Sequence, residues 1–427
     1  MAKADFFSYH FQLSFDVSIS KTKKIIRKRV KSYNICILSV DHQPEYLGGV
    51  KRVTSILGKK WQEIGHFVCY MTVCNSPIHK TKVNDIPQYF FPKPNQTFDE
   101  ENIQAIIQLI REKEINILLN PHVEDKEITN LAIKVHQISG IKIISALHFS
   151  PTSTYNIVRE SFFISYAMGK QPKEWVKNAL LWLRFKLYKG SQIKKEEGQW
   201  LKTVANESDC FVILSEKFKS YFDQRSQNVV AIYNPIDIST NERPIKKEKK
   251  VVWCGRLDIT GAKRVDRMLK IWQKVMPQHP DWNLVLLGSG DTNRINHLIK
   301  KHGINHIDVV GFCDDPNDYY KNATIVCSTS TVEGWGMVLV EGQQNGCVPC
   351  AFDSYESVHD IIQDGENGFL VRPFNLDLYA EKLCRLMDDE ELCSKMSAQA
   401  IRSVKRFDSS LIAQQWLNLF QSLQSKS

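Results

Sequence analysis

Two glutamates, Glu333 and Glu341, lie eight positions apart in a segment suited to binding an elongated ligand. Gly334 and Gly336 beside the first glutamate let the backbone approach a ligand closely. A helix is expected to begin near Met337, and its N-terminal amides would point toward the same place. Glu333 would precede this helix and Glu341 would lie about one turn inside it. The two carboxylates can therefore contact different parts of one ligand.

Two cations, Arg256 and Lys263, follow a second apolar run, residues 251–254. Both would lie at one strand end near a helix N-terminus, which suits a diphosphate whose negative charge grows as a bond to it breaks. The plain alternative is a pair of surface cations. Because the sequence has no Asp-x-Asp triplet, a metal-bound diphosphate is not indicated, and the two cations would neutralise the charge instead.

The elements that must position these residues are short apolar runs separated by helical patterns. Such runs are typical of strands buried on both faces of a sheet. Strands that alternate with helices predict parallel crossovers and doubly wound sheets. The runs are residues 35–40, 67–73, 115–119, 141–146, 211–214 and 229–233, followed by 251–254, 284–287, 307–310, 324–327, 348–352 and 369–371. Ligands of such sheets bind beyond the carboxyl ends of the strands.

The predicted fold class is α/β, with two Rossmann-like domains that face each other across a cleft. We expect one domain over residues 34–240 and a second over residues 241–407. The charged stretch 242–250 is interpreted as a solvated connection between them. A final amphipathic helix over 408–427 would join the first domain.

The segments around the two glutamates resemble the large retaining GT-B glycosyltransferase family usually numbered four. The mark of this family is a glutamate, seven residues and a second glutamate. The resemblance is strong over residues 250–407. The matching segments are Gly255-Arg256, Lys263, Gly311-Phe312 and Glu333-Gly-Trp-Gly with Glu341. One departure is that Lys263 lies two residues further from Arg256 than in most of the family, so the path of that loop is in doubt.

The resemblance implies a role for each matching residue. Glu341 would accept hydrogen bonds from the ribose hydroxyls of the donor nucleotide, and Glu333 would hold the donor sugar. Arg256 and Lys263 would bind the diphosphate. The remaining donor contacts would come mainly from backbone. The backbone around Cys313 would contact the base, and Gly288 after the strand 284–287 would also contact the donor. The sugar would be held by the backbone of Gly334, Trp335, Gly336 and Met337.

The N-terminal half carries a weaker resemblance at three places. Gly48 and Gly49, after the first strand, are similar to the glycine-rich loop that reaches the donor phosphates across the cleft. His148, after the strand ending near Ala146, matches the histidine near the reacting sugar, although a lone histidine after a strand is more often structural. Asn234-Pro235 matches the hinge of the family.

The implied reaction is sugar transfer with retention of anomeric configuration, in which the enzyme supplies orientation and leaving-group stabilisation. The donor would be a nucleotide sugar, with UDP the first choice, and the acceptor a glycan or lipid-linked glycan in bacterial polysaccharide or lipopolysaccharide synthesis. No cofactor or metal is expected. A GDP-mannose user is the nearest alternative, followed by a UDP-sugar epimerase on the same fold and a non-catalytic scaffold.

Charge and composition limit the other partners. A net charge of +9 comes without any recognisable nucleic-acid-binding module. Eleven scattered cysteines favour a reducing cytoplasm. The first 33 residues form a basic and aromatic extension, either a flexible tail or a contact with anionic lipid. Residues 173–189 form a basic amphipathic stripe, either packed on the domain or lying on the inner face of the cytoplasmic membrane.

Overall fold

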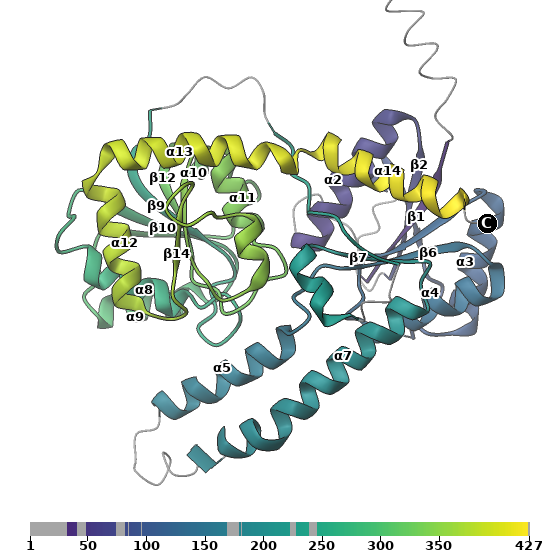
Figure 1. Ribbon diagram of the computed structural model, residues 1–427, viewed down its shortest axis with the longest axis horizontal. Helices are drawn as coiled ribbons and strands as arrows, with labels where there is room; N and C mark the ends of the chain where they lie inside the picture. The colour runs from purple at the N-terminus through teal and green to yellow at the C-terminus, as the bar shows by residue number, and fades with distance from the viewer. Residues whose placement is uncertain are drawn as a thin grey trace, which may run out of the picture.

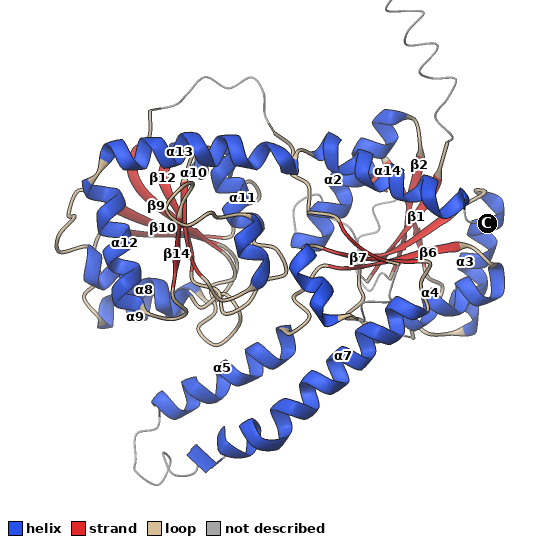
Figure 2. Ribbon diagram, viewed as in Figure 1, coloured by secondary structure: helices blue, strands red, loops and turns tan. Residues whose placement is uncertain are grey.

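The computed structural model of the chain describes residues 32–40, 48–73, 82–83, 85–94, 96–168, 179–180, 182–222, 228–238 and 246–425. Its two halves each contain a sheet with helices packed outside it (Figures 1 and 2). Each apolar run of the sequence overlaps a strand, so the predicted fold class is confirmed. The basic extension lies almost wholly outside the described residues, as do the first residues of the stripe, 173–178.

The described residues of the first half form an eight-stranded sheet in the order β3-β4-β2-β1-β5-β6-β7-β8. Its strands are β1 Asn34–Ser39, β2 Phe67–Thr72, β3 Lys82–Val83, β4 Ile86–Phe90, β5 Ile117–Asn120, β6 Lys142–Leu147, β7 Cys210–Ile213 and β8 Val229–Ala231. Neighbouring strands are parallel, apart from the β3–β4 pair. The helices of this half are α2 Gly49–Ile64, α3 Glu100–Glu112, α4 Lys126–Ser139, α5 Ser153–Met168, α7 Gly190–Asn206 and the short turns η1 Phe185–Lys189 and η2 Glu216–Tyr221.

Alternating residues of β1 show why these runs are apolar throughout. Ile35 and Ile37 pack on the side of α2, whereas Cys36 and Leu38 pack on the side of α3 and α4. All four side chains are fully buried. A strand covered by helices on both faces has no solvent-facing side, so its sequence loses the polar alternation of a surface strand.

The second half contains a six-stranded parallel sheet in the order β11-β10-β9-β12-β13-β14. Its strands are β9 Glu248–Cys254, β10 Asn283–Leu287, β11 Ile307–Gly311, β12 Ala323–Ser328, β13 Val348–Phe352 and β14 Phe369–Val371. Its helices are α8 Val265–Val275, α9 Thr292–Lys301, α10 Asn317–Asn322, α11 Met337–Gln344, α12 Leu376–Asp388, α13 Glu390–Val404, and the short turns η3 Glu356–Asp360 and η4 Lys405–Phe407; α14 Ser409–Ser425 follows. Because β9 lies between β10 and β12, the loops after these three strands meet at one sheet edge.

Two details of the sheets were not predicted. Strand β4 was missed because Pro87 interrupts its apolar pattern. The strand tolerates this proline because the β2–β4 ladder pairs Tyr70–Thr72 with Gln88–Phe90 and does not include it. The stretch 242–250 is not all connection, since β9 begins at Glu248, which pairs with Ala323 of β12. The charges of Glu248 and Lys249 concealed the strand because these side chains are exposed at its start.

The C-terminal helix α14 returns to the first half and packs on α2 (Figure 1). Trp416 and Phe420 contact Trp61 with ring centroids 6.0 and 5.4 Å away. The chain thus passes between the halves twice, and the two passages are hydrogen-bonded. The Ile236 amide donates to the Phe407 carbonyl over 2.9 Å, and the Ser409 amide donates to the Ile236 carbonyl over 2.8 Å.

A buried ion-pair network also joins the two halves. Glu160 of α5 contacts Arg264 and Arg267 at the start of α8, over 3.5 and 2.6 Å. Burial and the neighbouring Arg264 lower the pKa of Arg267 to about 10, so it is still a cation at neutral pH. A buried pair of this kind adds little net stability but holds partners in one arrangement. It places the middle of α5 beside the loop that contains Lys263.

Candidate functional site

The loops after β9 and β10 are held together by their backbones. The Gly255 amide donates to the Leu287 carbonyl over 2.9 Å, and the Leu257 amide donates to the Ser289 carbonyl over 2.8 Å. A Cβ on Gly288 would come within 1.9 Å of the Gly255 carbonyl oxygen, so only glycine fits there. In this structure Gly288 therefore shapes the loop that carries Arg256.

The two cations predicted for the diphosphate differ in burial and in their ion-pair partners. The side chain of Arg256 is 68% exposed, and its Nε lies 2.9 Å from Asp258 Oδ2. Lys263 is partly buried, and its Nζ lies 2.6 Å from Glu333 Oε1. The cation predicted for the diphosphate and the carboxylate predicted for the sugar are thus each other's partners. Lys263 is the better placed of the two cations to act inside the site.

Glu333 is fixed by more than Lys263. The Ser330 hydroxyl donates to the same Oε1 over 2.7 Å. The loop before it is tied to the Lys263 loop, because the Thr331 amide donates to the Ala262 carbonyl over 2.7 Å and the Thr329 hydroxyl donates to the Arg264 carbonyl over 2.9 Å. Two separate loops therefore position the pair, and its atoms are ordered before any ligand arrives.

Glu341 lies inside α11 and is buried. Its Oε1 lies 2.9 Å from Arg52 Nη1, which belongs to α2 in the other half of the molecule. Burial raises the pKa of Glu341, while the positive charges of Arg52 and Lys263 oppose that effect. The contact brings α2, which begins at the predicted glycine-rich loop, against the helix that carries the predicted ribose-binding carboxylate.

The Glu333 loop also contacts the first half. Gly334 lies so close to the residues after β6 that a Cβ would come within 1.9 Å of the His148 carbonyl oxygen and 2.8 Å of Phe149 Cα. Any other residue would force the loop away from His148. The structure thus brings His148, Lys263, Glu333 and Glu341 to one junction between the two halves.

We expect Gly334→Ala to destabilise the protein by about 1–3 kcal/mol, because backbone on both sides leaves no room for a methyl group. Gly198→Ala is the matched control: a Cβ there meets no atom within 4 Å, and alanine favours the interior of α7 by about 0.5–1 kcal/mol. Urea unfolding midpoints should fall for the first variant and stay or rise for the second. Equal shifts in both would show that the Gly334 contact is not tight.

His148 is a neutral side chain at this junction. Burial lowers its pKa to about 4, and the charge of nearby His122 adds to the effect. Its Nδ1 is buried and has no hydrogen-bond partner among the described residues. A buried nitrogen without a partner is costly, so a ligand hydroxyl placed beside it would gain a hydrogen bond.

The low pKa of His148 predicts a pH-dependent stability. Between pH 6.5 and about 4 the unfolded chain binds a proton at this histidine that the folded chain does not. Stability should therefore fall as the pH drops through this window, by at most about 3 kcal/mol. Urea midpoints measured across the window should fall more steeply for the wild type than for His148→Gln. Parallel curves would contradict a neutral, buried His148.

The other predicted donor contacts differ in what they can offer. Trp335 is buried against Tyr233 and Phe407, with ring centroids 4.9 and 5.2 Å away, and its indole Nε1 has no hydrogen-bond partner among the described residues. Gly336 precedes α11, which begins at Met337 as expected. Cys313 donates from Sγ to the Asp315 carbonyl over 3.1 Å.

Gly48 and Gly49 stand at the start of α2, where a Cβ on either would meet no atom within 4 Å. There is thus open space at the loop predicted to approach the donor phosphates. Residues 41–47, which lead into it, lie outside the described part of the chain.

Sequence patterns missed two residues at this junction. Arg52 was not predicted because it lies inside a helix, and its partner is 289 positions further along the chain, at Glu341. His122 follows β5, is buried, and has an Nε2 atom without a partner among the described residues. The rule that ligands bind beyond the carboxyl ends of parallel strands could have indicated His122, because β5 is the neighbour of β6.

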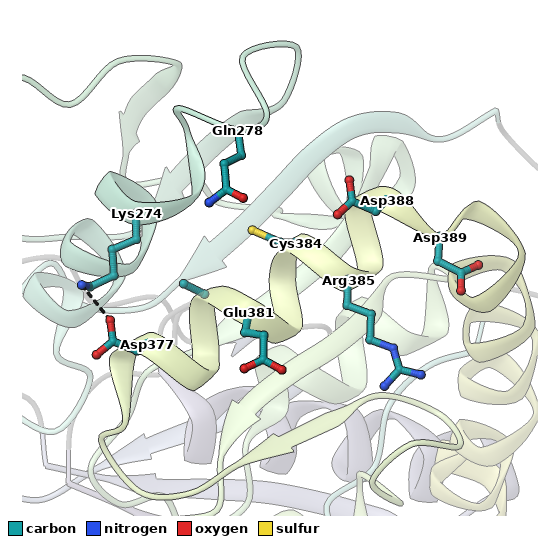
Figure 3. A pocket seen from close by; sticks show the side chains of 9 residues that line it. Lys274, Gln278, Asp377, Glu381, Cys384, Arg385, Asp388 and Asp389 are labelled. Atoms are coloured by element: carbon teal, nitrogen blue, oxygen red, sulfur yellow. Dashed lines mark ion pairs between the residues drawn. The ribbon is translucent and has the colours of Figure 1, made fainter.

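A hollow of about 640 Å³ lies elsewhere, between α8 and α12 (Figure 3). Its lining is mainly charged and includes the ion pair of Lys274 Nζ with Asp377 Oδ1 at 2.8 Å. None of the predicted site residues lines it. Within the described ranges no three His, Cys, Asp or Glu side chains gather as metal ligands do.

Comparison with known proteins finds a family match in the C-terminal half. The model of the family described as "Glycosyl transferases group 1" matches residues 236–403. An exopolysaccharide phosphotransferase of Streptomyces coelicolor is 28% identical over 246 residues, and an uncharacterised glycosyltransferase of Haemophilus influenzae is 28% identical over 245 residues. Both alignments cover 56% of this chain, but they cover 26% of the first relative and 68% of the second.

The fold has a counterpart among solved structures. HepE of Anabaena, solved in complex with UDP and glucose, superposes with a TM-score of 0.68 at 17% identity and covers 91% of this chain and 100% of HepE. At that identity the likeness establishes the arrangement of the two sheets and nothing about ligands. The Glycosyl transferases group 1 model thus matches residues 236–403, and the two sheets together have the GT-B fold.

Proposed function

We propose that the chain transfers a sugar, with retention of configuration, from a UDP-sugar to a glycan or lipid-linked glycan acceptor in bacterial polysaccharide or lipopolysaccharide synthesis. The observation that supports this proposal most is the junction between the two halves. There Lys263, Glu333 and Glu341 of one half meet His148 and Arg52 of the other. The name of the Streptomyces coelicolor relative supports polysaccharide synthesis, and the HepE complex supports UDP as the nucleotide of the donor.

The proposed chemistry starts from the ion pair between Lys263 and Glu333. A diphosphate placed beside Lys263 offers the ammonium a stronger partner than Glu333, since charge-assisted bonds to phosphate strengthen as the leaving group gains charge. Glu333 is then released to accept hydrogen bonds from sugar hydroxyls. Arg256, which is exposed, would join Lys263 at the diphosphate once its bond to Asp258 breaks. The cations would stabilise the leaving group without a metal.

His148 would act as a hydrogen-bonding group and not as a cation. Its low pKa keeps the imidazole neutral at physiological pH. A neutral imidazole has one donor and one acceptor nitrogen, so it can orient a sugar hydroxyl without adding charge near the anomeric carbon. In this scheme no side chain forms a covalent bond to the sugar, and positioning supplies most of the rate enhancement.

A direct test is to incubate the protein with a panel of nucleotide sugars and bacterial lipid extracts and to search for new glycans by mass spectrometry. We expect a product from a UDP-sugar only when the extract is present. An epimerised sugar formed from the donor alone would identify an epimerase instead. A larger thermal shift with GDP than with UDP would overturn the choice of nucleotide, because a ligand stabilises the state that it binds.

A further inference from the structure

Four large apolar side chains are exposed close together in the segment that leads into α7. Leu180 is 62% exposed, Leu183 46%, Leu187 71% and Tyr188 74%. Single exposed apolar residues are ordinary on protein surfaces, but a cluster is not, because each one leaves an apolar face in water. This cluster requires an explanation that the donor site does not provide.

The same helix has a packed side, so the exposure is not a sign of poor folding. Phe185 is buried and stacks on Tyr155 of α5, with ring centroids 5.6 Å apart and an interplanar angle of 22°. Gly190 is buried as well, and a Cβ there would touch both aromatic rings. Phe185–Lys189 form a π-helix, a widened turn that often marks functional positions. The helix thus turns its leucines outward from a fixed inner contact.

The surroundings of the cluster are strongly basic. Between residues 179 and 195 the chain has five cations and no acidic residue. All five side chains are exposed, and they are Arg184, Lys186, Lys189, Lys194 and Lys195. We call the four apolar residues and these five cations the arm surface. Figure 1 shows that α5 and the helix that continues into α7 extend away from both sheets at their far ends, and we call this pair of helices the arm.

We propose that the arm surface docks on an anionic lipid bilayer, with the apolar side chains at the boundary between headgroups and acyl chains and the cations among the phosphates. This combination of an apolar cluster and flanking lysines and arginines is what a bilayer interface binds. A symmetric contact with a second copy would place five cations opposite five cations, which is unfavourable. No helix among the described residues is long and apolar enough to cross a bilayer, so the contact would be peripheral.

The arm is connected to the junction between the two halves. Helix α5 begins at Ser153, soon after His148, and Glu160 in α5 is bonded to Arg264 and Arg267 beside Lys263. An arm held at a bilayer would therefore hold the junction of the two halves at a defined distance and orientation from it. Docking itself depends on neither donor nor acceptor, so it can be tested independently of the proposed glycosyl transfer.

The test is co-sedimentation of the full chain with vesicles of pure phosphatidylglycerol or pure phosphatidylcholine. We expect binding to the anionic vesicles, weakened by salt, and much weaker binding to the neutral ones. The double variant K186E/K189E and the single variant Leu187→Asp should each reduce binding by roughly tenfold or more. Matched controls are K300E/K301E on α9 and Leu411→Asp on α14, which change residues that are also exposed but lie far along the chain. Both controls should bind as the wild type does.

Unchanged thermal melting of the arm variants, with an unchanged shift on adding UDP, would show that reduced binding is not misfolding. Equal binding of the arm variants and the controls would overturn the proposal. So would equal binding of the wild type to neutral vesicles. A wild-type dimer on size-exclusion chromatography that Leu187→Asp dissociates would also overturn it, because the surface would then serve a second copy.

Discussion

Lys263→Ala is expected to lower kcat/KM for sugar transfer by roughly 100- to 1000-fold, the range seen when one preorganised group that stabilises developing charge is removed. Lys263 is the partly buried cation at the site, held 2.6 Å from Glu333 by two loops that are hydrogen-bonded to each other. Its interaction with a diphosphate grows as the sugar leaves. The loss should therefore appear mainly in kcat, with a smaller change in KM.

The matched control is Lys274→Ala. Lys274 belongs to the same half and also pairs with a carboxylate, Asp377 at 2.8 Å, but it lines the remote hollow of Figure 3. Steady-state kinetics with the donor and acceptor found by mass spectrometry should leave this variant near wild type. Lys263→Arg should recover part of the activity, because charge is retained while geometry changes. A Lys263→Ala enzyme within threefold or so of the wild type, by contrast, would remove the lysine from the leaving-group site.

Glu341→Gln is expected to weaken UDP binding by roughly 10- to 100-fold, which corresponds to the loss of about 1.5–3 kcal/mol from hydrogen bonds to a charged acceptor. Glutamine keeps the size of the side chain in a buried place, so the change tests charge and not packing. Isothermal titration calorimetry with UDP measures the effect without an acceptor. An unchanged affinity would mean that the ribose does not bind at Glu341.

Arg52→Gln separates the two partners that compete for Glu341. In this structure Arg52 Nη1 lies 2.9 Å from Glu341 Oε1 across the junction. Nucleotide binding must replace or share this contact, so removing Arg52 should leave UDP affinity unchanged or raise it by several-fold. A loss as large as that of Glu341→Gln would instead show that Arg52 itself contacts the nucleotide.

Membrane docking and the contact with the donor site would involve two different helices of the arm. The arm surface lies on residues 180–195, whereas Glu160 in the middle of α5 contacts Arg264 and Arg267 beside Lys263. The buried Glu160 network gives the arm a rigid base in this structure. Orientation of the junction toward a bilayer would suit a lipid-linked acceptor, which the proposed function includes.

The amino-acid sequence by itself determined the two sheets and the loops that matter. Unbroken apolar runs such as 348–352 could only become strands covered on both faces, because no polar alternation is present to face water. Once the strands are known, parallel crossovers place the loops with Lys263 and Glu333 at one edge of the second sheet. The same local spacing placed the start of α11 at Met337, as observed.

Only the tertiary structure decided which of these residues are partners. Glu341 pairs with Arg52, and Gly334 is fitted against His148, because the two halves approach each other through contacts between residues hundreds of positions apart. Local spacing carries no information about such pairs. Trp335 was expected to offer its backbone to the donor, and only the packing against Tyr233 and Phe407 decided where its side chain lies. Spacing along the chain determines the strands and their loops, whereas the approach of separate surfaces determines the site, because burial and ion pairing depend on distance in space.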